Sequence, residues 1–277
     1  MKFGVQVRAT AEGVDLVWLA RALEARGFES VFLPEHTHVP VNRSSVHPGG
    51  EELMDAARRG IDPFIGLAVI AGSTERLRLG TGICLLPQHD PIVLAKQVAT
   101  LDVLSGGRVI LGVGAGWARE EMANHGVDPA RRWDLLREKT LAVKALWTQE
   151  QASFEGELVR FGPVWQWPKP AQQPHPQILI GGEGPRVLER VVEYGDGWIP
   201  NWEADMPDRA AELGRLAADA GRGPLQVTVY ATPADPAVIA ACIVAGVERI
   251  CFNLPSNEMD ETDRALERLT KLIEALG

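Results

Sequence analysis

Apolar runs of strand length alternate with segments of helical period along nearly the whole chain. Each helical segment places apolar residues on one face, as Leu16, Leu19 and Leu23 do in the first of them. Runs that are apolar on both faces are typical of parallel strands covered by helices, and their alternation with helices indicates an α/β protein. The eight strand-length runs are 2–7, 29–34, 77–86, 108–116, 177–182, 196–200, 225–230 and 247–254.

The number of units decides between the α/β architectures. Eight strand–helix units in a chain of 277 residues predict one closed (β/α)8 TIM barrel domain, residues 1–277, rather than an open sheet. A loop from Val39 to about Gly60 follows the second strand. Residues 151–176, between strands four and five, predict an insertion with a short hairpin and five prolines. The helical segments are 14–27, 63–74, 91–107, 133–147, 185–194, 207–220, 236–246 and 260–276.

Composition and charge limit the classes of function that the protein can have. The net charge of −9, from 37 acidic and 28 basic residues, argues against an extended nucleic-acid surface. Cys84, Cys242 and Cys251 form no CxxC pair, so no disulfide framework is predicted. No apolar stretch has the length of a membrane span, and the start of the chain does not resemble a signal peptide. We therefore expect a cytoplasmic protein with no nucleic-acid or membrane partner.

A barrel of this kind carries its chemistry on the loops that follow the strands, and the second such loop holds Glu35, His36 and His38. Two imidazoles at this spacing would suit a metal ion, but the later strand ends offer only scattered acids, so we predict no metal. An ordinary loop histidine is the other alternative. We favour His36 as a general acid or base, because an unperturbed imidazole titrates near neutral pH.

Three later loops are rich in glycine. Gly80 and Gly82 interrupt the third strand, which is typical either of barrel packing or of a ligand approaching the backbone. Gly112–Gly116 imitates a dinucleotide fingerprint but lacks the strand that a Rossmann unit requires next, so we read it as a glycine turn facing a ligand. Gly181–Arg186 opens a helix, with Pro185 expected at its first position, and predicts a phosphate site rather than a plain turn.

Two common barrel chemistries are disfavoured. No lysine stands at a strand end, where a Schiff-base enzyme would need one, and no G-x-S-x-G nucleophile elbow is present. Several tryptophans are expected on loops at the mouth of the barrel, where they would suit a flat aromatic ligand. They are Trp117, Trp165, Trp167, Trp198 and Trp202.

Three segments together resemble the bacterial luciferase-like monooxygenase family, and within it the branch that uses the deazaflavin coenzyme F420. They are Glu35-His36, residues 79–117 and residues 174–198. The resemblance implies a (β/α)8 barrel with an insertion, a homodimer, and a flavin or deazaflavin at the mouth. It also implies a cis peptide at Gly82-Ile83 behind the ring and places His36 toward the substrate. The implied cofactor-binding residues are Glu35, Gly82, Ile83, Gly114, Ala115, Gly116, Gly181, Gly182, Gly184, Pro185 and Arg186.

The function implied is hydride transfer between F420 and a small organic substrate. An FMN-dependent monooxygenase and a non-catalytic flavin-binding protein remain as alternatives. Trp117 stands where a deazaflavin sugar-phosphate dehydrogenase has a glutamate, which favours a more apolar substrate. The anionic tail of F420 would require cations at the mouth, and the candidates are Arg8, Arg43, Arg119, Lys169 and Arg186.

Overall fold

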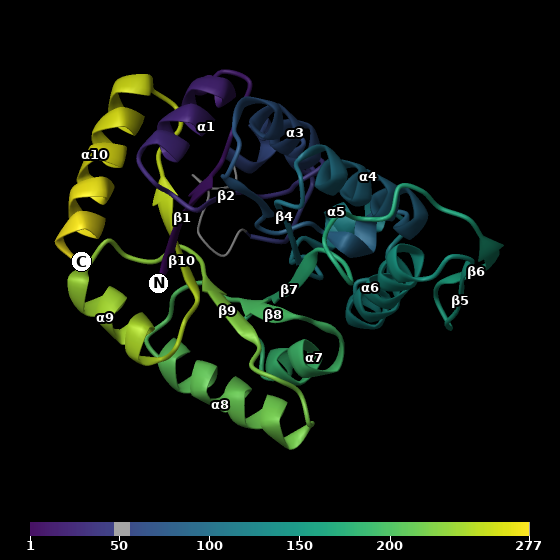
Figure 1. Ribbon diagram of the computed structural model, residues 1–277. Helices are drawn as coiled ribbons and strands as arrows, with labels where there is room; N and C mark the ends of the chain where they lie inside the picture. Colours follow the sequence, from purple (N-terminus) through teal and green to yellow (C-terminus); the bar gives the residue numbers. More distant parts are fainter. Residues whose placement is uncertain (47–55, 277) are drawn as a thin grey trace.

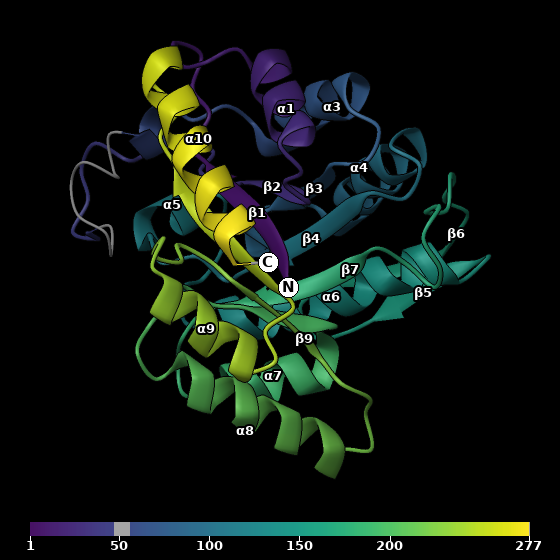
Figure 2. The same cartoon turned by 60° about the vertical axis from the view of Figure 1, so that its left-hand side comes forward.

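Eight parallel strands close into a barrel in the computed structural model, which describes residues 1–46 and 56–276. The strand order around the barrel is β1-β10-β9-β8-β7-β4-β3-β2, and β1 pairs with β10 so that the two termini lie close together (Figure 1, Figure 2). The predicted (β/α)8 fold is confirmed. The barrel strands are β1 (Lys2–Val7), β2 (Ser30–Leu33), β3 (Arg78–Thr81), β4 (Val109–Val113), β7 (Gln177–Gly181), β8 (Gly197–Ile199), β9 (Gln226–Val229) and β10 (Arg249–Leu254).

The helices form a ring outside the strands (Figure 1). Three of them begin with an Asp-Pro pair: Asp62, Asp90 and Asp235 each accept backbone N–H groups of the first turn, and the proline that follows needs no hydrogen-bond partner. No described helix is both long enough and apolar enough to cross a membrane. The helices are α1 (Leu16–Ala25), α3 (Pro63–Ser73), α4 (Pro91–Leu104), α5 (Arg119–Asn124), α6 (Arg132–Thr148), α7 (Val187–Tyr194), α8 (Met206–Asp219), α9 (Pro236–Val244) and α10 (Met259–Ala275), with the 3-10 turn η1 (Leu86–Gln88).

Two layers of apolar side chains fix the barrel. One layer packs the strands against the helices, and the other fills the barrel interior. At the end where the strands begin, the fully buried Arg249 guanidinium donates to both carboxylate oxygens of Glu29, each at 2.7 Å, and to the hydroxyl of Thr228 at 3.0 Å. This buried ion pair lies at the N-terminal end of the barrel. The interior layer consists of Phe32, Ile110, Leu179, Ile199, Tyr230 and Cys251.

The predicted insertion is present as a hairpin outside the barrel. β5 (Ala152–Glu155) and β6 (Arg160–Val164) pair antiparallel and project away from the barrel beyond α6 (Figure 1, Figure 2). The Glu138 carboxylate on α6 accepts three successive backbone N–H groups of the hairpin turn, those of residues 157, 158 and 159, at 2.8–3.0 Å. The hairpin is therefore attached to α6 and leaves the mouth of the barrel uncovered.

The fourth strand ends at Val113 rather than at residue 116, and two further predicted element boundaries at the mouth are wrong. The third strand ends at Thr81 rather than at residue 86, because the chain bulges at Gly82 and Ile83 and pairs again with β4 only through Cys84. The helix predicted over 185–194, α7, begins at Val187, with Arg186 as its N-cap residue, so Pro185 belongs to the preceding turn rather than to the first helical position. Both shifts fall where the strand ends meet the mouth, and both leave additional backbone exposed to it.

Candidate active site

A cavity of about 650 Å³ opens at the end of the barrel where the strands terminate. Its volume is in the range of small-molecule and cofactor sites. Of the twelve predicted site residues, Pro185 and Arg186 do not line it. The ten that do are Glu35, His36, Gly82, Ile83, Gly114, Ala115, Gly116, Gly181, Gly182 and Gly184. The structure therefore brings together residues from four separate loops.

The wall formed by β3, β4 and β7 consists mainly of glycine backbone. A Cβ atom on Gly114 would lie 1.9 Å from Cδ1 of Ile83, and one on Gly82 would lie 1.3 Å from the hydroxyl oxygen of Tyr230. Only glycine fits at either position. The Gly82-Ile83 peptide bond is cis, as the family resemblance implies. The result is a smooth wall of backbone that a planar ligand can approach closely.

The turn after β7 forms one edge of the cavity. The indole N–H of the buried Trp198 donates to the Gly182 carbonyl at 2.9 Å, and the Arg209 guanidinium of α8 donates to the Glu183 carbonyl at 2.8 Å. A Cβ atom on Gly184 would meet nothing within 4 Å. The turn is thus held from behind by side chains, and its glycine face opens on free space.

Several arginines surround this turn, whereas the sequence indicated only Arg186 as a cation beside the predicted phosphate. Arg186 is exposed and pairs with Glu189 at 3.4 Å. Arg190 lies 4.0 Å from the ring centroid of Trp133, which itself lines the cavity. Burial lowers the pKa of Arg190, and the nearby Arg186 and Arg132 also lower it. This concentration of positive charge suits an anion. Sequence reasoning missed Arg190 and Arg209 because their positions on α7 and α8 carry no motif.

His36 enters the cavity from the end of β2. Its Nδ1 atom lies 2.9 Å from Oε2 of Glu121, a carboxylate on α5 that is 1% exposed, and its ring meets Trp117 edge-on with centroids 5.5 Å apart. The other oxygen of Glu121 accepts the backbone N–H of Thr37 at 3.1 Å. Because Glu121 is hydrogen-bonded to Nδ1, it fixes the orientation of the ring.

Glu121 is a further candidate site residue that the sequence did not disclose. The only local signal is an acidic pair, Glu120 and Glu121, in the first turn of a short helix after β4, a pattern that solvated helix ends share. The neighbouring Glu120 accepts the N–H and hydroxyl of Ser44 instead. Only the folded chain distinguishes the two acids.

Glu35 also lines the cavity, but its carboxylate turns to other partners. It accepts the Leu85 N–H at 2.6 Å and contacts Nε2 of His89 at 2.9 Å. The Cys84 thiol lies beside them, with one ligand-type atom from each of Glu35, Cys84 and His89 within 4.8 Å of the others. Burial and the adjacent Glu35 raise the pKa of Cys84 well above its usual value. The protonated Cys84 thiol and the hydrogen-bonded Glu35 carboxylate therefore form a cluster with His89 that holds residues 83–89 in place. A direct cofactor contact by Glu35 stays a prediction.

Among the other residues expected at the mouth, the outcomes differ. Arg8 lines the cavity, whereas the expectation for Lys169 is wrong: its ammonium donates to the Leu146 and Gln149 carbonyls at the C-terminal end of α6, which lies at the opposite end of the barrel. Trp165 and Trp167 follow the hairpin and are 72% and 58% exposed. Of the five tryptophans named from the sequence, only Trp117 lines the cavity, where it is joined by Trp133.

Comparisons with known proteins agree with this geometry. The family model described as luciferase-like monooxygenase matches residues 1–245. An uncharacterised protein of Mycobacterium tuberculosis is 40% identical over 275 residues, covering 97% of each chain. A phthiodiolone/phenolphthiodiolone dimycocerosates ketoreductase of Mycobacterium bovis is 29% identical over 276 residues, covering 97% of this chain and 65% of the ketoreductase.

Solved structures share the fold at low sequence identity. A monooxygenase from Streptomyces bottropensis superposes with a TM-score of 0.81 at 21% identity, covering 99% of each chain. An F420-dependent secondary alcohol dehydrogenase in complex with an F420–acetone adduct gives 0.77 at 17% identity, covering 100% of this chain and 99% of that one. An FMN-bound type II Baeyer–Villiger monooxygenase of Pseudomonas putida gives 0.68 at 20%, covering 84% and 67%. The family-model match and the 40% identical relative show that this chain belongs to the luciferase-like monooxygenase family.

Proposed function

We propose that this protein is an F420-dependent oxidoreductase that moves a hydride between the deazaflavin and a small organic substrate. The observation that carries the proposal is the pairing of His36 with the buried Glu121 at the edge of a cavity whose facing wall is glycine backbone. A binding protein has no need of an oriented imidazole beside its ligand. An oxidoreductase acting on an alcohol or a carbonyl requires one, because a proton must leave or join oxygen as the hydride moves.

The residues present fit a deazaflavin or flavin. Gly82, Ile83 and Gly114–Gly116 would hold the ring system, because at Gly82 and Gly114–Gly116 no side chain beyond Cβ separates a planar ligand from the backbone. Gly182–Gly184, backed by the arginines around the turn, would hold the phosphate. When bound, F420 supplies the carbon that accepts or returns the hydride.

His36 would carry the proton through its Nε2 atom. The imidazole accepts the proton of a substrate hydroxyl during oxidation and returns it to a carbonyl oxygen during reduction. The Glu121 carboxylate would hold the ring in the same orientation in both directions, through its hydrogen bond to Nδ1 at 2.9 Å. Trp117 and Trp133 supply apolar surface on which the substrate and the cofactor can pack.

An FMN-dependent monooxygenase on the same barrel is the second candidate. It is favoured by the glycine wall and phosphate turn, which FMN would fit as well, and by the similarity to monooxygenase structures. The cofactors differ at ring position five, where the carbon of the deazaflavin suppresses oxygen activation. The choice between them therefore also decides between hydride transfer and oxygenation.

Separate titrations of the apoprotein with F420 and FMN test the proposal, with tryptophan fluorescence as the readout because Trp117 and Trp133 line the cavity. F420 is expected to bind more tightly at moderate salt. Tighter binding of FMN would instead support the monooxygenase, and binding of neither would reject both. The His36→Ala variant should retain cofactor affinity and lose about 10²–10⁴ in the rate of hydride transfer, the usual contribution of general acid–base catalysis.

A homodimer is part of the same proposal. Adjacent helices α3 and α4 expose apolar side chains, among them Ile65 and Val93, which are 68% and 55% exposed, together with Val69 and Ile92. Contiguous apolar surface of this kind marks protein–protein contacts. The cytoplasmic location expected from the sequence stays a prediction.

A further inference from the structure

The wall of the cavity opposite the phosphate turn carries polar side chains. Gln6 lies on the inner side of β1, and Arg8 follows the end of that strand. Asn253 on β10 is the register partner of Gln6, and Tyr230 follows β9. All four line the cavity. The cavity therefore has a glycine half on β3, β4 and β7 and a polar half on β1, β9 and β10.

The polar half holds groups whose hydrogen-bonding capacity is unused within the protein. Tyr230 is 5% exposed, yet its hydroxyl, which can donate to an anion, has no hydrogen-bond partner in the part of the chain that the structure describes. Gln6 is 6% exposed, and its Oε1 atom also lacks a partner among the described residues, so no hydrogen bond at Oε1 fixes the orientation of its amide group. Buried polar atoms of this kind are rare unless a ligand or water satisfies them, because leaving them unpaired is unfavourable.

Arg8 adds a charge to this group. Among residues 1–46 and 56–276, no carboxylate lies within ion-pair distance of its guanidinium. Burial lowers the pKa of Arg8, and the Tyr230 hydroxyl lies close enough to interact with it electrostatically. A half-buried guanidinium without an anion is unfavourable, so an anionic ligand group at this place would relieve the cost of its desolvation.

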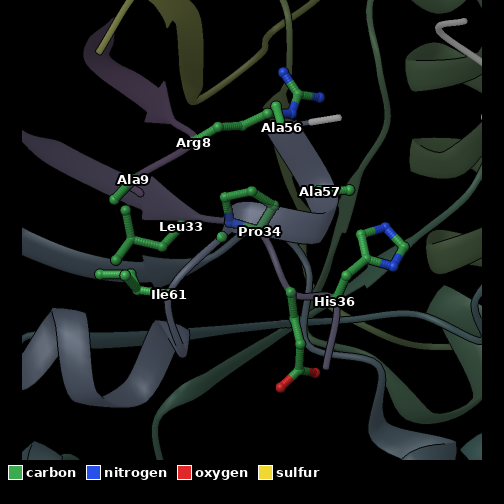
Figure 3. A pocket seen from close by; sticks show the side chains of 10 residues that line it. Arg8, Ala9, Leu33, Pro34, His36, Ala56, Ala57 and Ile61 are labelled. Carbon is green, nitrogen blue, oxygen red and sulfur yellow. The ribbon is translucent and has the colours of Figure 1, made fainter. Parts of the chain in front are cut away.

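The barrel order places Arg8 beside His36 and far from the phosphate turn. β1 and β2 are neighbouring strands, whereas β7 lies four strands from β1 in either direction around the barrel. Arg8 and His36 also share a smaller recess, in which both side chains extend toward the segment that carries Ala56 and Ala57 (Figure 3). An anion at Arg8 is therefore distinct from a phosphate on the turn after β7, and it lies next to the proton-transfer residue.

We propose that Arg8, together with the Tyr230 hydroxyl and the side-chain N–H groups of Gln6 and Asn253, binds a carboxylate group of the substrate. The substrate class is thus a small alcohol or carbonyl compound with an acidic group a few bonds from the reacting carbon. Its apolar portion would pack on Trp117, which agrees with the substrate expected from the sequence, and its acidic end is the new element. The inference rests on the proposed function, since it assigns the substrate of that site.

A matched pair of carbonyl compounds tests the proposal. Binding of 4-oxopentanoate and of 2-pentanone is measured by calorimetry on the cofactor-free protein and on the protein saturated with whichever of F420 or FMN binds more tightly. The wild type should bind the carboxylate at least tenfold more tightly. Arg8→Gln should abolish this preference while leaving the affinities for 2-pentanone and for the cofactor within about twofold, and Arg8→Lys should restore part of it. Arg21→Gln, which removes an exposed charge from α1, is the control and should retain the preference.

Two results would overturn the proposal. Equal binding of the two compounds by the wild type would show that no carboxylate site exists. A loss of F420 affinity in Arg8→Gln with an unchanged preference for 4-oxopentanoate would assign Arg8 to the anionic tail of the cofactor. The proposed function fails separately, through the cofactor titration of the wild type.

Discussion

Replacement of Glu121 by glutamine should reverse the proton arrangement on His36. In the wild type, one carboxylate oxygen accepts from Nδ1 of His36 at 2.9 Å and the other accepts the Thr37 N–H at 3.1 Å. The glutamine carbonyl can keep the bond to Thr37, but its amide group then faces Nδ1 as a donor. Nδ1 must then accept a hydrogen bond, so the neutral ring carries its proton on Nε2. That nitrogen is the one that would have to accept the substrate proton.

The size of the effect follows from the burial of this contact. Glu121 is 1% exposed, so water cannot replace a lost hydrogen bond. Returning His36 to the productive tautomer would leave two donors facing each other, which costs about 1–3 kcal/mol and corresponds to about 5- to 150-fold in rate. The protein should still fold and bind its cofactor, because the substitution conserves shape and retains the contact with Thr37.

Nitrogen NMR of the labelled histidines measures the tautomer without a substrate, and single-turnover hydride transfer measures the rate. Glu120→Gln is the matched control: it removes the same charge one residue away, where the carboxylate bonds Ser44 rather than His36. The reasoning would be refuted by an identical His36 tautomer in Glu121→Gln and the wild type, or by equal rates at saturation. An equal loss in the Glu120 variant would point to charge rather than orientation.

Three further outcomes are expected. Gly184→Asp should fold, since a Cβ atom there meets open space, but it should bind a phosphorylated cofactor at least tenfold more weakly. Gly223→Asp, which is equally unhindered but lies at the other end of the barrel, is the control and should bind the cofactor normally in the same titration. Burial lowers the pKa of Lys139 to about 8, so between pH 8 and 10.5 the unfolded chain binds more protons than the folded chain. The free energy of unfolding should therefore rise with pH in this range, by up to about 1.4 kcal/mol per pH unit. Urea unfolding at several pH values should show that Lys139→Met loses this rise. The wild type should sediment as the proposed dimer and Ile65→Glu as a monomer; a monomeric wild type would reject the dimer, and a dimeric variant would reject the contact through α3 and α4.

Local patterns predicted most of the fold because they report local physics. Apolar runs, Asp-Pro pairs and glycine turns act over a few residues, so the eight strands, their helices and the hairpin insertion could all be derived from neighbouring residues. Boundaries failed where distant contacts intervened. The third strand stops at Thr81, where the chain bulges at Gly82, and the Tyr230 hydroxyl, about 150 residues away in sequence, leaves space only for glycine there.

The candidate site divides in the same way. The sequence alone determined the barrel, the glycine-rich loops at its mouth and the histidine beside them, because strand ends in a barrel converge on one face. The tertiary structure decided which charges act there. It paired His36 with Glu121 across 85 residues, turned Glu35 toward His89, moved Lys169 to the far end and left Arg8 in the cavity without a carboxylate among the described residues. The position of a charged side chain in the sequence does not show which residue it will pair with, because charged residues have no periodicity like that of apolar ones. The two partners come within hydrogen-bond distance only when the barrel closes.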